Sequence, residues 1–376
     1  MPVRIAPTLA GMATYPFVRL EEARRRLVAA GVDVIDFGKG DPNEPTDPVI
    51  RRALVDAVPE RAPYPLAAGL PELRDAAAGW CRRRFGVEVD PETELVPTYG
   101  SKEAIFSLAQ VLVDAGSEKR VVAFGEPAYP VYERGALFAG AEVQLLPLVR
   151  ENGFLPDLAA LDERTAIVWV NYPHNPTGAV APLAFYEELA ALAERLDFVI
   201  ASDEAYSELW FDAPPASALQ VADRSRVVVF QTLSKRSSMT GYRSGFVAAP
   251  PEVIAALKAY RPTVGTAPQE FVQRASIVAW TDERHVEETR ARYAAKRDVM
   301  VPALAGHGFE IVASEATMYL WVAVPDAETL VEQLLERGVL VSPGSFFGPS
   351  GEGYVRFALV PTLAECERAA AILAEL

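Results

Sequence analysis

The feature that most constrains the fold is an alternation of short apolar runs and helical segments between residues 103 and 260. The runs are rich in β-branched residues and short, which predicts strands buried on both faces. The intervening segments, such as residues 182–196, place their apolar side chains at helical spacing. We therefore expect an α/β fold with a mainly parallel sheet sandwiched by helices. The runs are VVAF from Val121, EVQLLPL from Glu142, AIVWV from Ala166, FVIASD from Phe198, VVVFQT from Val227 and GFVAAP from Gly245.

The pattern changes after Pro268. A long charged helix, from about Glu287 to Leu304, leads into mixed apolar runs and two further helical segments. This mixture predicts a smaller α+β domain. We expect residues 46–285 to form the large domain and residues 286–376 the small one, with an N-terminal segment, residues 1–45, joining the small domain.

The amino-acid composition limits the classes of partner that the chain can bind. The chain carries 36 Lys and Arg against 51 Asp and Glu, a net charge of −15. Nucleic acid and anionic membranes would repel such a chain, so neither is expected as a partner. The first residues resemble no signal peptide and no run is long enough to span a bilayer, which predicts a cytoplasmic protein. Cys81 and Cys366 lie in isolated contexts and the three histidines lack ligand spacing, so we expect neither a disulfide framework nor a metal site.

Ligands of parallel α/β sheets bind beyond the carboxyl ends of the strands, so the residues that follow each run are the ones to inspect. Reactive side chains follow several of these ends. They are Asn175 in NYPHNPTG, Asp203 and Tyr206 in SDEAY, Lys235 and Arg243 in TLSKRSSMTGYRSGF, and Gly100, Ser101 and Lys102 in a turn that opens a helix. The last group is a potential anion site, because a helix N-terminus offers free N–H groups and a favourable dipole.

Lys235 follows a buried strand, where an ammonium is costly. Its side chain either reaches solvent or serves as an amine in a cleft. The other residues also have ordinary explanations. Asp203 and the Gly100–Ser101 pair would serve as helix caps, and Asn175 as part of a turn. Tyrosines pack, and Arg356 in YVRFALV would point outward from a strand.

These separate explanations do not account for the clustering of the residues at one sheet edge. A phosphorylated carbonyl cofactor accounts for it. Lys235 would form a Schiff base with the carbonyl. Asp203 would keep a pyridine nitrogen protonated, so that the ring accepts electrons. Tyr206 and Asn175 would hold the phenolic oxygen of the ring.

The motifs resemble those of the fold-type I, pyridoxal-phosphate-dependent aminotransferases of class I/II. The motifs NYPHNPTG, SDEAY and TLSKRSSMTGYRSGF occur in the order and with the separations typical of that family. The matches YGSKEAI, PAYPVY, YPLAAGLPELRDA and YVRFALV extend the resemblance over essentially the whole chain. It implies a mainly parallel seven-stranded sheet, pyridoxal 5'-phosphate as cofactor and a ping-pong exchange of amino groups with a keto acid, 2-oxoglutarate being expected.

The resemblance also implies roles for individual residues. Lys235 would be the Schiff-base and proton-shuttling lysine, and Tyr129 would stack on the cofactor ring. Arg356 would clamp the α-carboxylate of the substrate, helped by the backbone of Gly40. The residues expected around the phosphate are Gly100, Ser101, Lys102, Ser234 and Arg243. Tyr64 would reach the phosphate of a neighbouring subunit, which implies a homodimer with shared active sites.

The substrate is less constrained. The chain is most similar to the short bacterial succinyldiaminopimelate aminotransferases, through AYPVYERGA, MYLWV and RGVLVSPGSFFGPSGEGYVRFALV. We therefore expect N-succinyl-L,L-diaminopimelate as the donor, in lysine biosynthesis, with Lys39, Lys102 or Arg261 near its distal carboxylate. His174 departs from the serine or proline of close relatives and is expected to be a neutral loop residue.

Three alternatives stay open. The first is an aminotransferase for aspartate, alanine, an aromatic amino acid or free L,L-diaminopimelate. The second is a C–S lyase on the same fold. The third is a non-enzymatic cofactor-binding regulator, which the acidic charge disfavours because such a domain would need a DNA-binding partner segment.

Overall fold

The computed structural model describes residues 3–10, 12 and 17–376. Within this part, seven strands form the large sheet in the order β2-β8-β7-β6-β5-β3-β4. Of these seven, β8 alone runs antiparallel to its neighbours. The strands are β2 (Leu95–Thr98), β3 (Val121–Glu126), β4 (Glu142–Pro147), β5 (Thr165–Asn171), β6 (Val199–Asp203), β7 (Val227–Thr232) and β8 (Gly245–Ala248).

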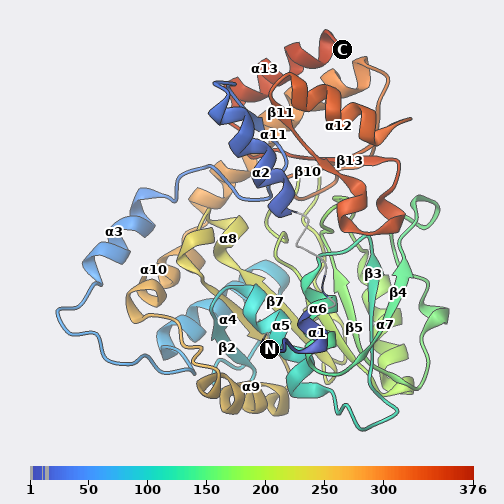
Figure 1. The fold of residues 1–376 in the computed structure, drawn as a ribbon. Coiled ribbons are helices and arrows are strands. Elements are labelled where there is room, and N and C mark those ends of the chain that lie inside the picture. Colours follow the sequence, from blue (N-terminus) through green and yellow to red (C-terminus); the bar gives the residue numbers. More distant parts are fainter. Residues whose placement is uncertain (1–2, 11, 13–16) are drawn as a thin grey trace.

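Both faces of the central strands are buried, as the unbroken apolar runs predict, whereas the edge strand β4 is largely exposed. In β5, Ile167 and Trp169 pack into the core on one face, and Val168 and Val170 into the core on the other. Helices cover both faces (Figure 1). The helices around the sheet are α3 (Pro48–Asp56), α4 (Pro71–Phe85), α5 (Ser101–Leu112), α6 (Val131–Phe138), α7 (Leu183–Leu196), α8 (Leu233–Arg236), α9 (Pro251–Thr263) and α10 (Glu270–Thr281).

The C-terminal part forms a separate layer above the large sheet (Figure 1). Its antiparallel sheet, in the described residues, has the order β12-β13-β10-β9 and is covered by helices. The strands are β9 (Glu310–Ala313), β10 (Tyr319–Ala323), β12 (Ser342–Pro343) and β13 (Tyr354–Ala358). The helices are α11 (Arg284–Gly306), α12 (Ala327–Glu336) and α13 (Leu363–Ala374).

The N-terminal segment contributes α1 (Pro7–Ala10), α2 (Phe17–Ala29) and β1 (Ile35–Asp36). β1 pairs in parallel with β11 (Val339–Leu340), so the end of this segment is tied to the C-terminal layer. The grouping of residues 1–45 with the small domain stays a prediction, and residues 1–2, 11 and 13–16 of that segment lie outside the described part. The boundaries at 45/46 and 285/286 stay predictions.

The α/β fold with a smaller α+β layer is confirmed, and each of the six apolar runs is a strand of the large sheet. β2 was not among those runs, because LVPT is short and contains a proline. Cys81 and Cys366 are buried free thiols. No helix among the described residues is long and apolar enough to cross a membrane.

Candidate active site

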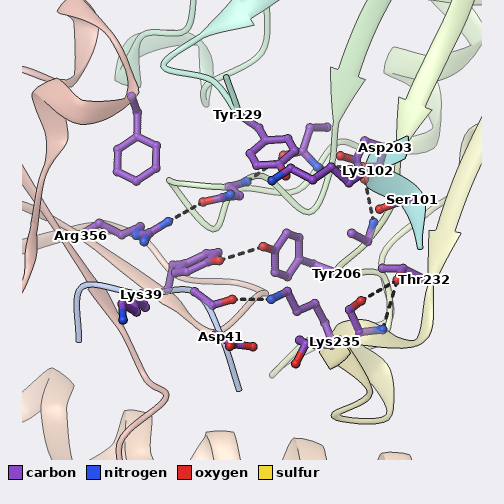
Figure 2. Close-up of a pocket in the computed structure, with 18 of the residues that line it drawn as sticks. Lys39, Asp41, Ser101, Lys102, Tyr129, Asp203, Tyr206, Thr232, Lys235 and Arg356 are labelled. Atoms are coloured by element: carbon purple, nitrogen blue, oxygen red, sulfur yellow. Dashed lines mark hydrogen bonds between the residues drawn. The ribbon is translucent and has the colours of Figure 1, made fainter. Parts of the chain in front are cut away.

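A cavity of about 550 Å³ lies at the carboxyl ends of β5, β6 and β7, beneath the C-terminal layer (Figure 2). Its walls bring together residues from the large sheet, from the loop after β1 and from β10 and β13. Most of the residues singled out from the sequence line it. These are Gly40, Ser101, Lys102, Tyr129, Asn175, Asp203, Tyr206, Ser234, Lys235, Arg243 and Arg356.

Lys235 lies in α8, the short helix that follows β7, and its side chain crosses the floor of the cavity (Figure 2). Its Nζ donates a hydrogen bond to the carbonyl of Gly40. Burial above all, with Asp41 opposing it and Arg356 and Arg243 adding to it, lowers the pKa of this amine to about 8. Lys235 therefore extends into the cavity and not over the outer surface. It offers an amine that loses its proton far more easily than an ordinary lysine.

The helix that carries Lys235 is tied down from its other side. Arg236 is 2% exposed and donates to the carbonyl of Ala279 and to Glu283 Oε2, at 2.7 Å for the carboxylate. Next to it, the Ser237 hydroxyl lies 2.8 Å from His285 Nε2. These bonds join α8 to α10 and α11, so the backbone of Lys235 is held by neighbours outside the cavity.

Asp203 ends β6 at the opposite side of the cavity. The carboxylate is 5% exposed, and its Oδ2 accepts a hydrogen bond of 2.7 Å from the Tyr132 hydroxyl. Burial raises its pKa to about 6, and bonds from Tyr132 and the Ala205 N–H work against that rise. A buried carboxylate of this kind is stabilised by a cationic partner in the cavity.

In a third region of the cavity, several side chains and backbone N–H groups can donate hydrogen bonds to an anion. Ser101 begins α5, whose N-terminus directs free N–H groups toward it, and Ser234 and Arg243 line the same region. Arg243 has a left-handed backbone with φ 59°, and its guanidinium donates 2.8 Å to the Thr240 carbonyl. Burial lowers the pKa of Lys102, and the positive charge of Arg243 lowers it to a smaller extent.

Aromatic and amide groups lie between these ends. Tyr129 and Tyr206 both line the cavity, and the Tyr206 hydroxyl lies 2.8 Å from that of Tyr319. Asn175 Oδ1 accepts 2.9 Å from Arg356 Nη1, so its Nδ2 is the side-chain atom that can donate to a ligand. His174 is buried and burial lowers its pKa to about 3, as expected for a neutral loop residue.

Arg356, on β13, is 1% exposed and lies across the cavity from Asp203 (Figure 2). Besides Asn175, it donates 2.8 Å to the Gly38 carbonyl, and its guanidinium lies 4.3 Å from the ring centroid of Tyr319. It therefore does not point outward from its strand. Its fork faces the cavity, where a carboxylate can bind in a bidentate manner.

These groups fit pyridoxal phosphate. The cavity offers an anion end, a buried carboxylate for a protonated ring nitrogen, aromatic and amide side chains between them, and an amine of lowered pKa. Most residues expected to hold the cofactor are thus assembled in one place, while their individual roles stay predictions.

Some expected residues lie elsewhere. Arg261 does not line the cavity: it is fully buried and forms an ion pair with Glu103 Oε1 at 3.0 Å, so its proposed contact with a distal carboxylate is wrong. Gly100 lies behind the wall, where a Cβ would press on Arg243. Tyr64 is fully exposed on this single chain. Lys39 lines the cavity and pairs with Glu21 on α2.

Several lining residues were given no role, although most of them lie within the quoted motifs, because the sequence alone does not show which motif residues face the cavity. These are Asp41, Asn171, Ala205, Thr232, Thr240, Tyr319 and Phe347. Asn171 is the most informative of them: it donates 2.7 Å to the Asp203 carbonyl and accepts 3.0 Å from the Asn175 N–H. Its position was the available signal, since Asn171 ends β5 and is itself the first residue of NYPHNPTG.

Comparison with known proteins decides the family. The model of aminotransferase class I and II matches residues 32–373. This chain belongs to that family. Class I and II aminotransferases are pyridoxal-phosphate-dependent enzymes, so the expected cofactor and reaction class are confirmed.

Individual relatives agree over nearly the full length. LL-diaminopimelate aminotransferase 2 of Nostoc is 39% identical over 95% of this chain and 94% of its own. The LL-diaminopimelate aminotransferase of Aquifex aeolicus is 41% identical over 93% of both chains. A solved aminotransferase from Neisseria meningitidis superposes with a TM-score of 0.92, at 36% identity and 99% coverage of both chains. This aminotransferase therefore shares its whole architecture with solved members of the family.

Proposed function

We propose that this aminotransferase exchanges the amino group of free L,L-diaminopimelate with 2-oxoglutarate by a ping-pong mechanism. The observation that carries the reaction is the facing pair of Lys235 and Arg356 within one cavity, one able to move a proton and the other to hold a carboxylate. The names of the relatives support the donor. N-succinyl-L,L-diaminopimelate, the donor favoured by the sequence motifs, becomes the second candidate.

Lys39, which lines the cavity, and its partner Glu21 support the free amino acid. Lys39 lines the cavity and its ammonium contacts Glu21, and that hydrogen bond lowers the pKa of the glutamate. The distal end of free diaminopimelate carries one ammonium and one carboxylate. A lysine–glutamate pair can receive both, whereas a succinylated end offers no ammonium to Glu21.

The chain's own groups account for the chemistry. Pyridoxal phosphate, when bound, supplies an aldehyde for the amino group and a ring that withdraws electrons from the substrate Cα–H bond. Arg356 binds the α-carboxylate that both substrates share, which fixes Cα near Lys235. The lowered pKa of Lys235 makes its neutral amine available to take the Cα proton near neutral pH and to return it elsewhere.

The test is a half-reaction without a keto acid. The loaded protein is mixed in turn with L,L-diaminopimelate, its N-succinyl derivative, glutamate, cystathionine and phenylalanine, and the visible band of the cofactor is followed. We expect rapid loss of the band with L,L-diaminopimelate and with glutamate. Faster loss with the succinylated donor would replace the substrate and keep the reaction. Release of pyruvate and ammonia from cystathionine would instead support a C–S lyase.

We also propose that the enzyme works as a cytoplasmic homodimer. Tyr64 is fully exposed on the single chain, and the Lys102 and Arg243 side chains are shared between the active-site cavity and a second hollow of about 690 Å³. A partner's tyrosine entering there would complete the phosphate site. Sedimentation should give a dimer. Tyr64→Phe should weaken cofactor binding while the dimer stays intact. A monomer with full activity would contradict the proposal.

A further inference from the structure

Tyr132 is a buried tyrosine that the motif-based assignment leaves without a role. It lies in the first turn of α6, three residues after Tyr129, and is 3% exposed. Its hydroxyl does not point to a backbone group, as those of many buried tyrosines do. It donates a hydrogen bond of 2.7 Å to Oδ2 of Asp203.

We propose that Tyr132 is a positioning residue that orients the Asp203 carboxylate and keeps it ionised for the ring nitrogen of the cofactor. The inference deepens the proposed function, since it rests on the role of Asp203 as partner of that nitrogen. Tyr132 acts through Asp203 and has no contact of its own with the reacting atoms.

The hydrogen bonds around the carboxylate single out this phenol. The Ala205 N–H approaches Oδ1 at 3.3 Å, which is a long bond. Asn171 donates 2.7 Å, but to the backbone carbonyl of Asp203. The strong donor to the carboxylate, among the described residues, is therefore the Tyr132 hydroxyl, and hydrogen bonds to ionised acceptors are the stronger ones.

Other titratable groups surround Asp203 without replacing this bond. Tyr206, in the loop after β6, lies nearby with its hydroxyl engaged by Tyr319. Lys235 lies across the cavity and is bonded to Gly40. The adjacent Glu204 turns its carboxylate the other way, accepting 2.9 Å from the Ala218 N–H and 3.0 Å from Gln231 Nε2.

Packing fixes the direction of the phenol. The Tyr132 ring stacks on Trp169 with centroids 4.9 Å apart and an interplanar angle of 18°. The edge of the same ring meets Tyr129, at 5.8 Å and 78°. One side chain thus supports both the tyrosine expected on the ring face and the carboxylate expected at the ring nitrogen. Its ring contacts would survive the loss of the hydroxyl.

The ionisation of Asp203 also supports a role for the Tyr132 hydroxyl. Burial favours the protonated form of Asp203, and the bond from Tyr132 favours the ionised form. A protonated Asp203 cannot hold a proton on the pyridine nitrogen by charge. Removing the hydroxyl should therefore shift the ionisation of Asp203 to higher pH and weaken the hold on the cofactor.

The test compares Tyr132→Phe with Tyr172→Phe. Tyr172 is a matched control, because its buried hydroxyl donates 2.6 Å to the Phe154 carbonyl and not to Asp203. Both variants lose one buried hydrogen bond. Cofactor affinity is measured against pH by titrating each apo protein with pyridoxal phosphate and following the visible band.

We expect Tyr132→Phe to bind the cofactor about tenfold more weakly at pH 7, with the rise in affinity displaced to higher pH, and Tyr172→Phe to keep the native profile. A native profile for Tyr132→Phe, or equal changes in both variants, would overturn the inference.

A double variant separates the test of this inference from the test of the proposed function. In Asp203→Asn the phenol has no carboxylate to orient, so adding Tyr132→Phe should change cofactor affinity no further. Additive losses would show that Tyr132 acts independently of Asp203 and would overturn the inference. If Asp203→Asn alone left cofactor affinity and its pH profile unchanged, the assigned role of Asp203 would fail first.

Discussion

The two sides of the active-site cavity are built in different ways. The side that would face the cofactor comes from β5, β6 and β7, which are neighbours in one sheet and are packed on both faces. The side that would face the substrate joins distant parts of the chain: Arg356 on β13 bonds to Gly38, 318 positions away. We infer that the first side is a fixed platform for one cofactor, and that the second can vary with the substrate.

The largest effect is expected on the cofactor side. Lys235→Ala removes the group that carries the proton at Cα, so turnover should fall by at least about a thousandfold, as measured by keto-acid formation. The fold should survive, because α8 is held by Arg236 and Ser237. Lys258→Ala on the outer part of α9 is the control and should keep native activity. Full activity in Lys235→Ala would remove the central residue from the account.

On the substrate side, Arg356→Ala should lower kcat/KM by about a hundredfold for both the amino donor and the keto acid, because one buried cation would bind the carboxylate of each. Cofactor content, read from the visible spectrum, should stay near native. Arg356→Lys keeps the charge without the fork and should recover only part of the loss. A loss confined to one substrate would show that the two do not share this clamp. A loss of cofactor would show that Arg356 also belongs to the cofactor side.

The pH dependence of cofactor attachment tests one residue of the cofactor side, Lys235. Burial lowers the pKa of Lys235 to about 8, and attack on an aldehyde needs the neutral amine. The rate at which the apo protein develops the visible cofactor band should therefore rise with pH and level off just above about pH 8. A rate still rising steeply through pH 10 would indicate an ordinary, exposed lysine.

The smallest effect is expected at Lys39 and Glu21. Both side chains are partly exposed, so each should contribute only about a threefold change. Lys39→Ala should raise KM for L,L-diaminopimelate and leave alanine unaffected. Glu21→Gln should narrow the preference for L,L-diaminopimelate over its N-succinyl derivative. Unchanged preference in both variants would place the distal site elsewhere on the substrate side.

The platform was predictable from sequence because its residues follow strands that the apolar runs reveal. Asp203 ends such a run, and Lys235 and Asn175 lie in the short helix or the loop that follows one, so sheet topology brings them together.

The substrate side was less predictable. Tyr319 reaches Tyr206 across 113 positions, and no local pattern encodes that approach. Arg261 was misjudged for the same reason: as a lone arginine in a helix it looked available, but Glu103, 158 positions away, neutralises it. Tyr132 was overlooked because its partner Asp203 lies 71 positions further on.

The most direct test of the central claim is to locate the cofactor on the chain. The protein is loaded with pyridoxal phosphate, reduced with borohydride, digested and mapped by mass spectrometry. The account predicts a single phosphopyridoxyl group on the peptide that contains Lys235, and none in a sample first treated with excess amino donor. Attachment to another lysine, or none at all, would contradict the assignment of this cavity as the active site.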